Sequence, residues 1–264
     1  MILDEIAVKT RERIQAEKRR VPLSEMKALA AEAKARRQEE GGEDFPFEKA
    51  LAKPDMSFIC EVKKASPSKG VIAEHFPYLE IAEEYEAAGA DAVSVLTEPF
   101  YFRGSNDYLF QIRRKVSLPL LRKDFTVDEY MIYQARTIGA DAILLICAIL
   151  SPGQLSEYGG IARELGLSAL VEAHDEREVE MALAANAGII GINNRNLKDF
   201  TVDIENSVRL RSMVSGNILY VSESGMKTRE DIARLEENGI DGVLIGERLM
   251  RSPDKAGLLR ELKG

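Results

Sequence analysis

A short phrase that recurs about every 50 residues constrains the fold of this chain more than any other feature of its sequence. The segment at 89–93, GADAV, returns as GADAI at 139–143 and, less closely, as GIDGV at 239–243. A fourth copy, AGII at 187–190, lacks the aspartate. The glycines of the four copies, at 89, 139, 188 and 239, are 50, 49 and 51 residues apart. One βα unit of a closed barrel takes roughly 25–30 residues, so each repeat spans two units and four copies mark alternate strands of eight.

In each copy a glycine follows a helical pattern and precedes an apolar run. Glycine just past a helix end supplies the left-handed residue that stops the helix. An apolar run rich in β-branched residues is typical of a parallel strand that is buried on both faces. The copies therefore predict strands at 91–96, 141–146, 188–193 and 241–245. The remaining strands are predicted midway between them, at 57–62, 118–122, 168–172 and 218–222.

Helical patterns fill the gaps between these strands, at 79–88, 107–115, 128–138, 152–165, 176–185, 204–213 and 229–238. Several begin with a residue that can cap a helix, namely Asp107, Asp128, Ser151, Asp175, Asp203 and Thr228. Alternation of eight strands with helices in 264 residues predicts an α/β protein with a (β/α)8 TIM barrel. A doubly wound open sheet is the alternative. Its usual G-x-G-x-x-G is replaced here by Ser-Pro-Ser-Lys-Gly after the first strand.

Residues 1–56 precede the barrel and are predicted to be a helical extension packed on it, so that 1–264 form one domain. Ile2, Leu3, Ile6 and Ile14 have helical spacing, and Ser24 can cap a second helix at 25–37.

The composition narrows the class of protein. A net charge of -8 and a pI of about 5.1 argue against nucleic acid as a partner. The longest apolar run, 142–150, is too short to span a membrane, and the N-terminus is too charged for a signal peptide. The two cysteines, Cys60 and Cys147, lie in apolar runs without metal-site spacing and are expected in the core. We therefore expect a cytoplasmic protein.

Polar residues at the ends of the predicted strands are the candidates for function, because barrel enzymes carry their active sites there. The odd-numbered strands end in Glu61 and Lys63, Lys123, Glu172, and Glu223 with Ser224. Odd-numbered strands share layers of side chains inside such a barrel, so these groups are expected to be neighbours and to shift one another's pKa values. For any one of them alone, a solvated charge or an ion pair at the rim is an equal alternative.

The loops after the last two strands predict a phosphate site. Gly225 follows the seventh strand, and Gly246 follows the eighth and opens a short helical segment at 247–250. Such loops, with a helix N-terminus, bind phosphate in this fold, because glycine lets backbone N–H groups approach the anion. Glu247 can contribute its N–H only if its carboxylate points away.

Several motifs together resemble one family. The segment at 61–70, EVKKASPSKG, resembles the signature of indole-3-glycerol phosphate synthases, which usually carry Arg or Lys where Lys64 stands. Supporting motifs are TEPFYFRGS at 97–105, LLRKDF at 120–125, LVEAH at 170–174, GINNRNL at 191–197 and VSESG at 221–225. The resemblance spans almost the whole chain. It implies a carboxy-lyase of tryptophan biosynthesis that needs no metal or organic cofactor.

The substrate implied by the resemblance is 1-(2-carboxyphenylamino)-1-deoxyribulose 5-phosphate. Its ring closes with loss of carbon dioxide, and dehydration then gives the indole. We expect this phosphorylated small molecule as the partner, with neither nucleic acid nor membrane, and a monomeric protein.

The resemblance also implies roles for individual residues. Lys123 is the general acid at the ribulose carbonyl, and Glu172 is the general base or stabilises the cationic intermediate. Lys63 binds a carboxylate or phosphate and shares acid duty. Positioning groups that complete the polar ring are Glu61, Asn193, Glu223 and Ser224. Anionic substrate groups are held by Ser66, Arg195, Gly225 and Gly246, with Glu247 beside them.

An apolar slot for the aromatic ring is expected from Phe102, Phe125 and Leu197, with simple loop anchoring as the alternative. Lys64 is expected to point away from the mouth, and residues 66–70 to form a mobile loop. His174, beside Asp175 at a helix start, is expected to be a surface or capping residue rather than a catalytic one.

Two other functions are weighed. A different phosphate-binding barrel, such as an isomerase or an aldolase, could use Lys123 as a Schiff-base lysine, but it would not need the matching set of Glu61, Glu172 and Glu223. A non-catalytic sugar-phosphate-binding protein would keep the glycines and tolerate loss of the lysines and glutamates, all of which are intact here.

Overall fold

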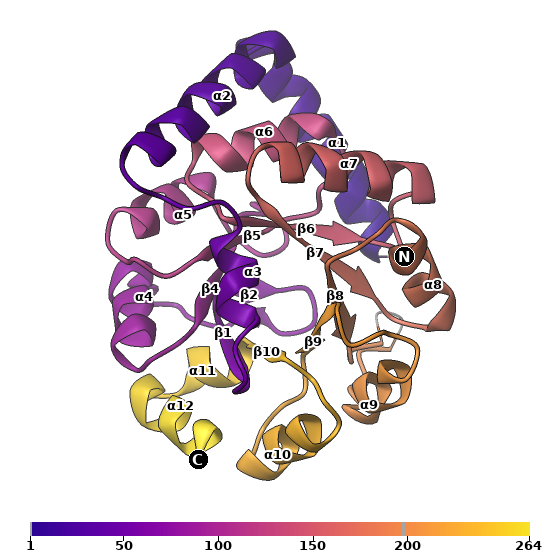
Figure 1. Cartoon of the computed structure of the whole chain (residues 1–264). Helices are drawn as coiled ribbons and strands as arrows, with labels where there is room; N and C mark the ends of the chain where they lie inside the picture. The colour runs from indigo at the N-terminus through magenta and orange to yellow at the C-terminus, as the bar shows by residue number, and fades with distance from the viewer. Residues whose placement is uncertain (1, 197–198) are drawn as a thin grey trace.

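The chain folds into a closed barrel of eight parallel strands with helices around it (Figure 1). The structure is a computed structural model that describes residues 2–196 and 199–264. The barrel strands are β1 (Ser57–Val62), β4 (Ala92–Leu96), β5 (Leu120–Lys123), β6 (Ala142–Ile146), β7 (Ser168–Ala173), β8 (Ile189–Asn193), β9 (Leu219–Glu223) and β10 (Gly242–Ile245). β1 pairs with both β4 and β10, which closes the barrel and rules out the open sheet.

The helices alternate with these strands as predicted. Around the barrel lie α4 (Tyr78–Ala87), α5 (Asn106–Arg113), α6 (Glu129–Thr137), α7 (Pro152–Glu164), α8 (Glu176–Ala184), α9 (Glu205–Arg211), α10 (Arg229–Glu237), α11 (Glu247–Arg251) and α12 (Lys255–Lys263). The extension forms α1 (Ile2–Arg20), α2 (Leu23–Glu39) and α3 (Pro46–Leu51). The first loop carries a small antiparallel pair, β2 (Ala65–Ser66) with β3 (Gly70–Val71). Neither α3 nor this pair was predicted, because segments this short show no periodicity.

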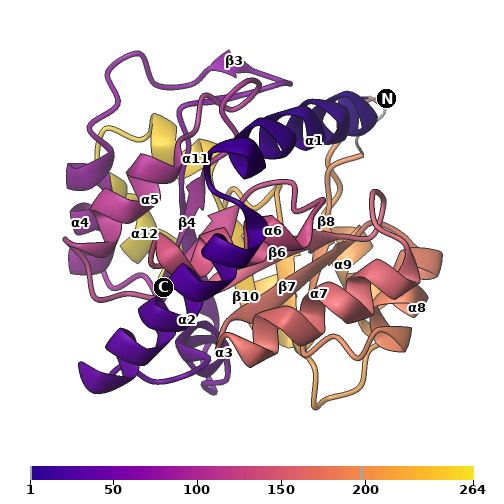
Figure 2. The ribbon, with the colours of Figure 1, turned by 90° about the horizontal axis from the view of Figure 1, so that it is seen from above.

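The extension packs at both ends of the barrel. Figure 2 shows α1 on the same side as β3, and α3 on the opposite side. Leu3 and Ile6 of α1, and Phe47 and Leu51 of α3, belong to the same buried cluster as the side chains that fill the barrel interior. The extension therefore contributes side chains to the core of the barrel.

The repeated aspartates fasten each strand to the one before it. The carboxylates of Asp91, Asp141 and Asp241 accept hydrogen bonds from the backbone N–H groups of Phe58, Leu120 and Tyr220, at 2.8, 2.9 and 2.7 Å. Each aspartate directly precedes its own strand, and each donor lies at the start of the preceding strand. The repeated aspartates therefore connect neighbouring strands at the N-terminal end of the barrel, opposite the strand ends that carry the candidate site.

One copy of the repeat was aligned wrongly. Gly89, Gly139 and Gly239 are left-handed, with φ of 81°, 88° and 70°, as the predicted helix stops require. In the fourth copy the left-handed residue is Asn186, with φ of 56°, and not Gly188. Asparagine tolerates this conformation better than most residues do, so it can replace glycine at a helix end.

Three predicted caps were also wrong. α5 is capped by Ser105, whose Oγ accepts the Asp107 N–H at 3.1 Å, so Asp107 lies inside the helix. The residue before α9 is Ile204, although Asp203 accepts the Glu205 N–H at 3.0 Å. α2 follows Pro22 rather than Ser24. The caps predicted at Asp128, Ser151, Asp175 and Thr228 are confirmed.

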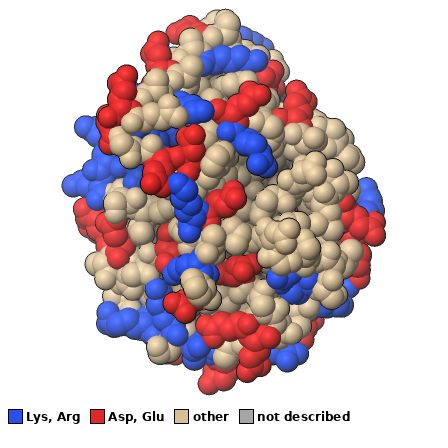
Figure 3. Space-filling model, viewed as in Figure 1, with Lys and Arg blue, Asp and Glu red and all other residues tan. Residues whose placement is uncertain are grey.

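Two further features of the described chain bear on its class. Cys60 and Cys147 are free thiols buried in the core, as predicted. None of the helices within the described ranges combines the length and the apolar character needed to cross a bilayer. On the face shown in Figure 3, basic and acidic side chains are interspersed, so this face offers no continuous basic surface for nucleic acid.

Candidate active site

A cavity of about 950 Å³ opens at the C-terminal ends of the strands. Leu144 and Ile146 of β6 and Leu244 of β10 contribute apolar lining. The predicted site residues that line it are Glu61, Lys63, Ser66, Phe102, Lys123, Phe125, Glu172, Asn193, Arg195, Glu223, Ser224, Gly225, Gly246 and Glu247. Leu197 lies outside the described residues. The barrel thus brings the described candidates to one place, whereas their roles in catalysis stay predictions.

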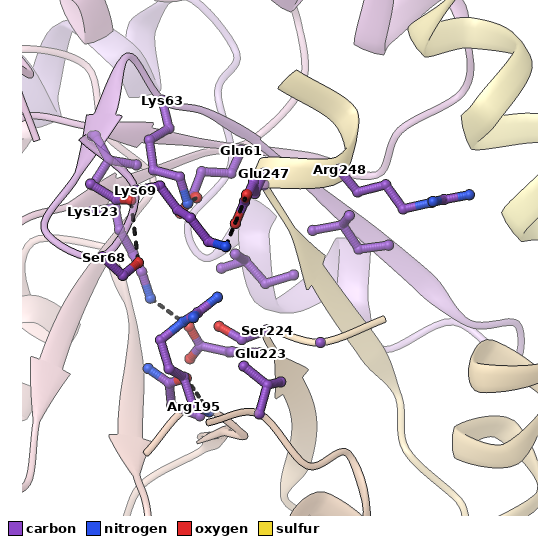
Figure 4. A pocket seen from close by; sticks show the side chains of 18 of the residues that line it. Glu61, Lys63, Ser68, Lys69, Lys123, Arg195, Glu223, Ser224, Glu247 and Arg248 are labelled. Atoms are coloured by element: carbon purple, nitrogen blue, oxygen red, sulfur yellow. Dashed lines mark hydrogen bonds and ion pairs between the residues drawn. The ribbon is translucent and has the colours of Figure 1, made fainter. Parts of the chain in front are cut away.

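Lys123 is the centre of the polar group. It ends β5 and its Nζ lies 2.5 Å from Glu223 Oε2 and 3.2 Å from Glu172 Oε2 (Figure 4 shows the bond to Glu223). The two carboxylates come from β9 and β7, so three odd-numbered barrel strands meet at one ammonium, as the layer argument predicts. The side chains of Glu172 and Glu223 are buried, and that of Lys123 is 13% exposed.

Burial and the excess of negative charge shift these groups in different directions. Burial alone would lower the pKa of Lys123, but the charges of Glu223, Glu172 and Glu61 outweigh it and raise that pKa. For Glu223, burial together with the charges of Glu172 and Glu61 outweighs Lys123 and raises the pKa to about 7. For Glu172, burial is outweighed by Lys123 and His174, which lower the pKa. The site therefore holds a lysine that stays protonated, Lys123, an ionised carboxylate, Glu172, and a carboxyl group that titrates near neutral pH, Glu223.

Glu61 on β1 forms a second ion pair, with Lys63, which directly follows this strand. Glycines of neighbouring strands make room for the site's carboxylates. A Cβ at Gly246 would overlap the Glu61 carboxylate and lie 2.9 Å from Lys63 Nζ, and a Cβ at Gly191 would overlap Glu223 Oε1. Gly191 was not predicted to be part of the site. An isolated glycine within a strand is the signal that marks such a close approach.

The loop after β9, one of the two predicted to bind phosphate, has an uncommon backbone conformation. Ser224 and Gly225 are both left-handed, with φ of 69° and 103°, and a Cβ at Gly225 would lie 2.6 Å from Val202 Cγ1. The carboxylate of Glu247 is occupied, because Arg251 Nε lies 3.2 Å and Lys69 Nζ 3.9 Å from Glu247 Oε1 (Figure 4). These cations offset the charge that would otherwise repel a phosphate.

The end of β8 supplies two of the candidates. Asn193 Nδ2 lies 3.4 Å from Glu172 Oε1, and Asn193 Oδ1 accepts the backbone N–H of Arg195. Arg195 itself lines the cavity and donates to the Phe200 carbonyl at 3.3 Å. Asn194 between them is buried and donates to Ser222 Oγ, so it supports the loop from behind.

The apolar part of the cavity includes residues that sequence reasoning did not place there. The rings of Phe102 and Phe125 are 5.9 Å apart, and Ile2, Leu3 and Ile6 of α1 line the same cavity. The apolar face of α1 was recognised, but its partner surface was not, because helical spacing shows only that a face is buried.

An ion pair fixes α1 over the site. Arg13 Nη2 lies 2.8 Å from Asp124 Oδ2, and Asp124 directly follows Lys123. Thr97 Oγ1 donates to the same oxygen at 2.8 Å, so the buried Asp124 carboxylate ties the extension to two strand ends.

His174 does not lie where it was expected. Asp175, not His174, caps α8, and the His174 side chain is only 17% exposed. Its Nε2 lies 3.5 Å from Glu172 Oε1. The expectation of a surface or capping residue was therefore wrong. The signal was available, since residues two apart in extended chain, such as Glu172 on β7 and His174 directly after it, point to the same side.

The first loop agrees with part of the expectation. Lys64 Nζ lies 6.0 Å from the centre of the Phe76 ring and is not among the residues that line the cavity. Ser66 lines the cavity and is held in the small β2–β3 pair. The mobility of this loop stays a prediction. Within residues 2–196 and 199–264, no group of three or more His, Cys, Asp or Glu could hold a metal ion.

Comparison with known proteins gives a consistent picture. The family model "Indole-3-glycerol phosphate synthase" matches residues 3–262. An indole-3-glycerol phosphate synthase of Ruminiclostridium cellulolyticum is 53% identical over 264 residues, covering 100% of this chain and 99% of that protein. One of Endomicrobium trichonymphae is 51% identical over 263 residues, covering 100% of both.

Solved structures at low identity show the fold alone. A crystal structure of 3-hexulose-6-phosphate synthase has a TM-score of 0.64 at 12% identity, covering 79% of this chain and 98% of that one. A chain of the tryptophan synthase complex from Pyrococcus furiosus has a TM-score of 0.58 at 16% identity, covering 79% and 97%.

Proposed function

This chain belongs to the indole-3-glycerol phosphate synthase family of carboxy-lyases, and we propose that Lys123 and Glu172 are the general acid and the general base of its reaction. The family's reaction closes a ring. The aromatic carbon that bears the carboxylate attacks the ketone of the ribulose chain, carbon dioxide leaves, and loss of water completes the indole. The observation that supports the assignment is the place of Lys123 at the mouth, between Glu172 and Glu223.

Ring closure needs a proton at the ketone oxygen as negative charge develops there. The Lys123 ammonium, whose raised pKa keeps it protonated, can supply that proton and offset the charge. Attack by the aromatic carbon also leaves a positive, non-aromatic ring. The ionised carboxylate of Glu172, with its lowered pKa, suits the stabilisation of that intermediate.

Dehydration needs one proton given and one removed. Glu172 is our choice for the base, held in place by Asn193. Glu223, with a pKa of about 7, can exchange a proton near neutral pH and, with Ser224 and the Glu61–Lys63 pair, completes the polar ring.

Substrate anions are assigned to the rim. The phosphate is placed at the backbone of Gly225 and Gly246, with the N–H of Glu247 beside them and Lys63 and Ser66 facing it. Arg195 is assigned to the other anionic group, the carboxylate. Phe102 and Phe125 receive the aromatic ring, and Leu197 is kept in this slot on the resemblance alone.

The aldolase alternative fits the electrostatics less well. A Schiff-base lysine must be neutral to attack a carbonyl and is usually activated by a lowered pKa. The pKa of Lys123 is instead raised by the surrounding carboxylates. We therefore expect borohydride to trap no adduct between Lys123 and a keto substrate, and a trapped adduct would favour the aldolase.

We also propose that the chain is one domain, a monomer and cytoplasmic. The contribution of Leu3, Ile6, Phe47 and Leu51 to the barrel core supports a single domain. A charged, phosphorylated substrate does not cross a bilayer unaided, so the enzyme is expected in the compartment where its substrate is made, which we propose to be the cytoplasm. Light scattering at micromolar concentration tests the oligomeric state.

The decisive experiment follows indole fluorescence after adding the carboxyphenylamino-deoxyribulose phosphate. The wild type should form the fluorescent product indole-3-glycerol phosphate, and absence of this product would end the proposal. Lys123→Ala and Glu172→Gln should each lower kcat by about 10²–10⁴-fold, the usual contribution of a positioned acid or base. Lys115→Ala, at an exposed position just after α5, is the matched control and should keep wild-type turnover. Wild-type rates in either site variant would remove that residue's role.

A further inference from the structure

His174 is a half-buried titratable group that the reaction as proposed does not use. It directly follows β7, two residues after Glu172, so both side chains leave the strand on the same side. Its Nε2 lies 3.5 Å from Glu172 Oε1, slightly long for a hydrogen bond. No hydrogen-bond partner of this buried nitrogen is found among the described residues. A polar atom is thus aimed at the proposed general base and left unsatisfied.

The other side of the imidazole is held firmly. Glu178 Oε2 lies 3.0 Å from His174 Nδ1 and also accepts the backbone N–H of His174 at 2.9 Å. A carboxylate can only accept, so Nδ1 carries a hydrogen. Glu178 is placed for this task by α8, where its own N–H is bonded to the cap residue Asp175. Nε2 then either carries the second hydrogen, in the imidazolium, or presents a lone pair to Glu172.

The surroundings of the ring favour the imidazolium. The charged groups that face it are Glu172 on β7, Glu178 on α8 and Glu223 on β9, with Lys123 of β5 bound to two of these and Asp175 and the thiol of Cys147 close by. Burial alone would lower the pKa of His174, but the bond to Glu178 and the charges of Glu172, Glu178 and Glu223 raise it above its ordinary value. Burial raises the pKa of Cys147 to about 12, so that thiol stays neutral.

We propose that His174 is a positioning residue for Glu172, which it holds ionised and oriented by donating from Nε2–H to Glu172 Oε1. Glu178 fixes the ring so that this hydrogen can point only towards Glu172. The inference rests on the proposed role of Glu172 as the base. Because only the imidazolium has the Nε2–H, the contact is present below the pKa of His174 and is lost as pH rises through it.

Direct titration tests the contact without any assay of activity. The chain has two histidines, His75 and His174, so imidazole NMR signals can be assigned with a His75→Gln variant. Glu172→Gln should lower the pKa of His174, because it removes the charge that faces the imidazole. An unchanged pKa of His174 in Glu172→Gln would overturn the proposal. This holds even if Glu172→Gln is inactive, so a failed contact is distinguishable from a failed general base.

Activity variants test the consequence. His174→Leu should lower kcat about 10-fold with little change in KM, as expected for loss of one charge-assisted hydrogen bond to a catalytic group. His174→Gln keeps an N–H donor at every pH, so it should restore most of the turnover and remove one alkaline inflection from the wild-type pH profile. Titration of Glu223 is common to all these proteins and cancels in the comparison.

Glu178→Gln completes the set. The amide oxygen can still accept both hydrogen bonds from His174, but the negative charge is gone. The inflection assigned to His174 should therefore move to lower pH while the plateau below it is unchanged. A wild-type profile in both His174→Gln and Glu178→Gln would overturn the proposal.

Discussion

The two ends of the barrel both bury charge, but they balance it in opposite ways. At the N-terminal end one carboxylate has two cations, since Asp141 lies 2.9 Å from Arg113 Nη1 and 2.6 Å from Arg37 Nη2 and also accepts the Leu120 N–H. At the mouth one cation serves two carboxylates, because Lys123 lies between Glu172 and Glu223. Glu223 Oε1 has no hydrogen-bond partner in the described part of the chain.

This difference separates charges that stabilise the fold from charges kept for chemistry. A buried carboxylate with its own cations and a backbone donor has its desolvation offset, so removing it leaves uncompensated charge. A carboxylate that must share a cation is held at a cost to stability, and its pKa moves into the range useful for proton transfer. This agrees with the general division of labour in such barrels, where the C-terminal end carries the active site and the N-terminal end contributes to stability.

The largest stability effect is expected at the N-terminal end. Asp141→Ala strands Arg37 and Arg113 and the Leu120 N–H, so the free energy of unfolding should fall by about 3–5 kcal/mol. Asp241→Ala is the matched control. Its carboxylate accepts the Tyr220 N–H, so its loss should cost only about 1–3 kcal/mol.

Urea unfolding measures both variants, and kcat per folded molecule should stay near the wild-type value. A loss of stability below 1 kcal/mol for Asp141→Ala, or a tenfold fall in kcat, would contradict the conclusion that charges at the N-terminal end serve stability and those at the mouth serve chemistry.

A smaller effect of the opposite sign is expected at the mouth. Glu223 has an ordinary pKa of 4.5 when unfolded and a pKa of about 7 in the folded protein. The folded state therefore holds a proton that the unfolded chain releases, so stability from this group is fully present below pH 4.5 and is lost as pH rises to 7. Glu223→Gln removes this loss. As pH rises from 4.5 to 7.5, the free energy of unfolding of this variant should increase relative to that of the wild type by on the order of 2 kcal/mol.

Unfolding at a series of pH values, with activity followed in parallel, tests this prediction. Activity should fall although stability at neutral pH rises. A stability difference that is independent of pH would show that the mouth is as well balanced as the opposite end.

The smallest change in stability is expected in the outer layer of helices, away from both ends of the barrel. Gly160 lies inside α7, and a Cβ there would have nothing within 4 Å. Gly160→Ala should raise the free energy of unfolding by about 0.4–1 kcal/mol, by restricting the unfolded chain, with no pH dependence and no change in kcat. Destabilisation would mean that this position makes a contact which the open space does not suggest.

The strand ends were predictable because their signal is local. A run such as 57–62 alternates between the two sides of the sheet, so Glu61 and Lys63 are placed on the mouth side by their sequence positions alone. The repeated aspartates were recognised as markers of strands, but their hydrogen bonds to the preceding strand were not. Those bonds join residues that the chain separates by a whole helix.

The sequence by itself determined the barrel, the order of its elements and which polar residues gather at the strand ends that line the cavity. A 50-residue repeat and alternating apolar runs depend only on neighbours in the chain. The tertiary structure alone decided that α1 covers the mouth, that Gly191 and Gly246 leave room for carboxylates, and that His174 faces Glu172. It also decided that Glu172 and Glu223, both glutamates at strand ends, titrate differently. The reason is physical, since burial and the distance to a shared cation set a pKa, and both arise only when the closed register brings distant strands together.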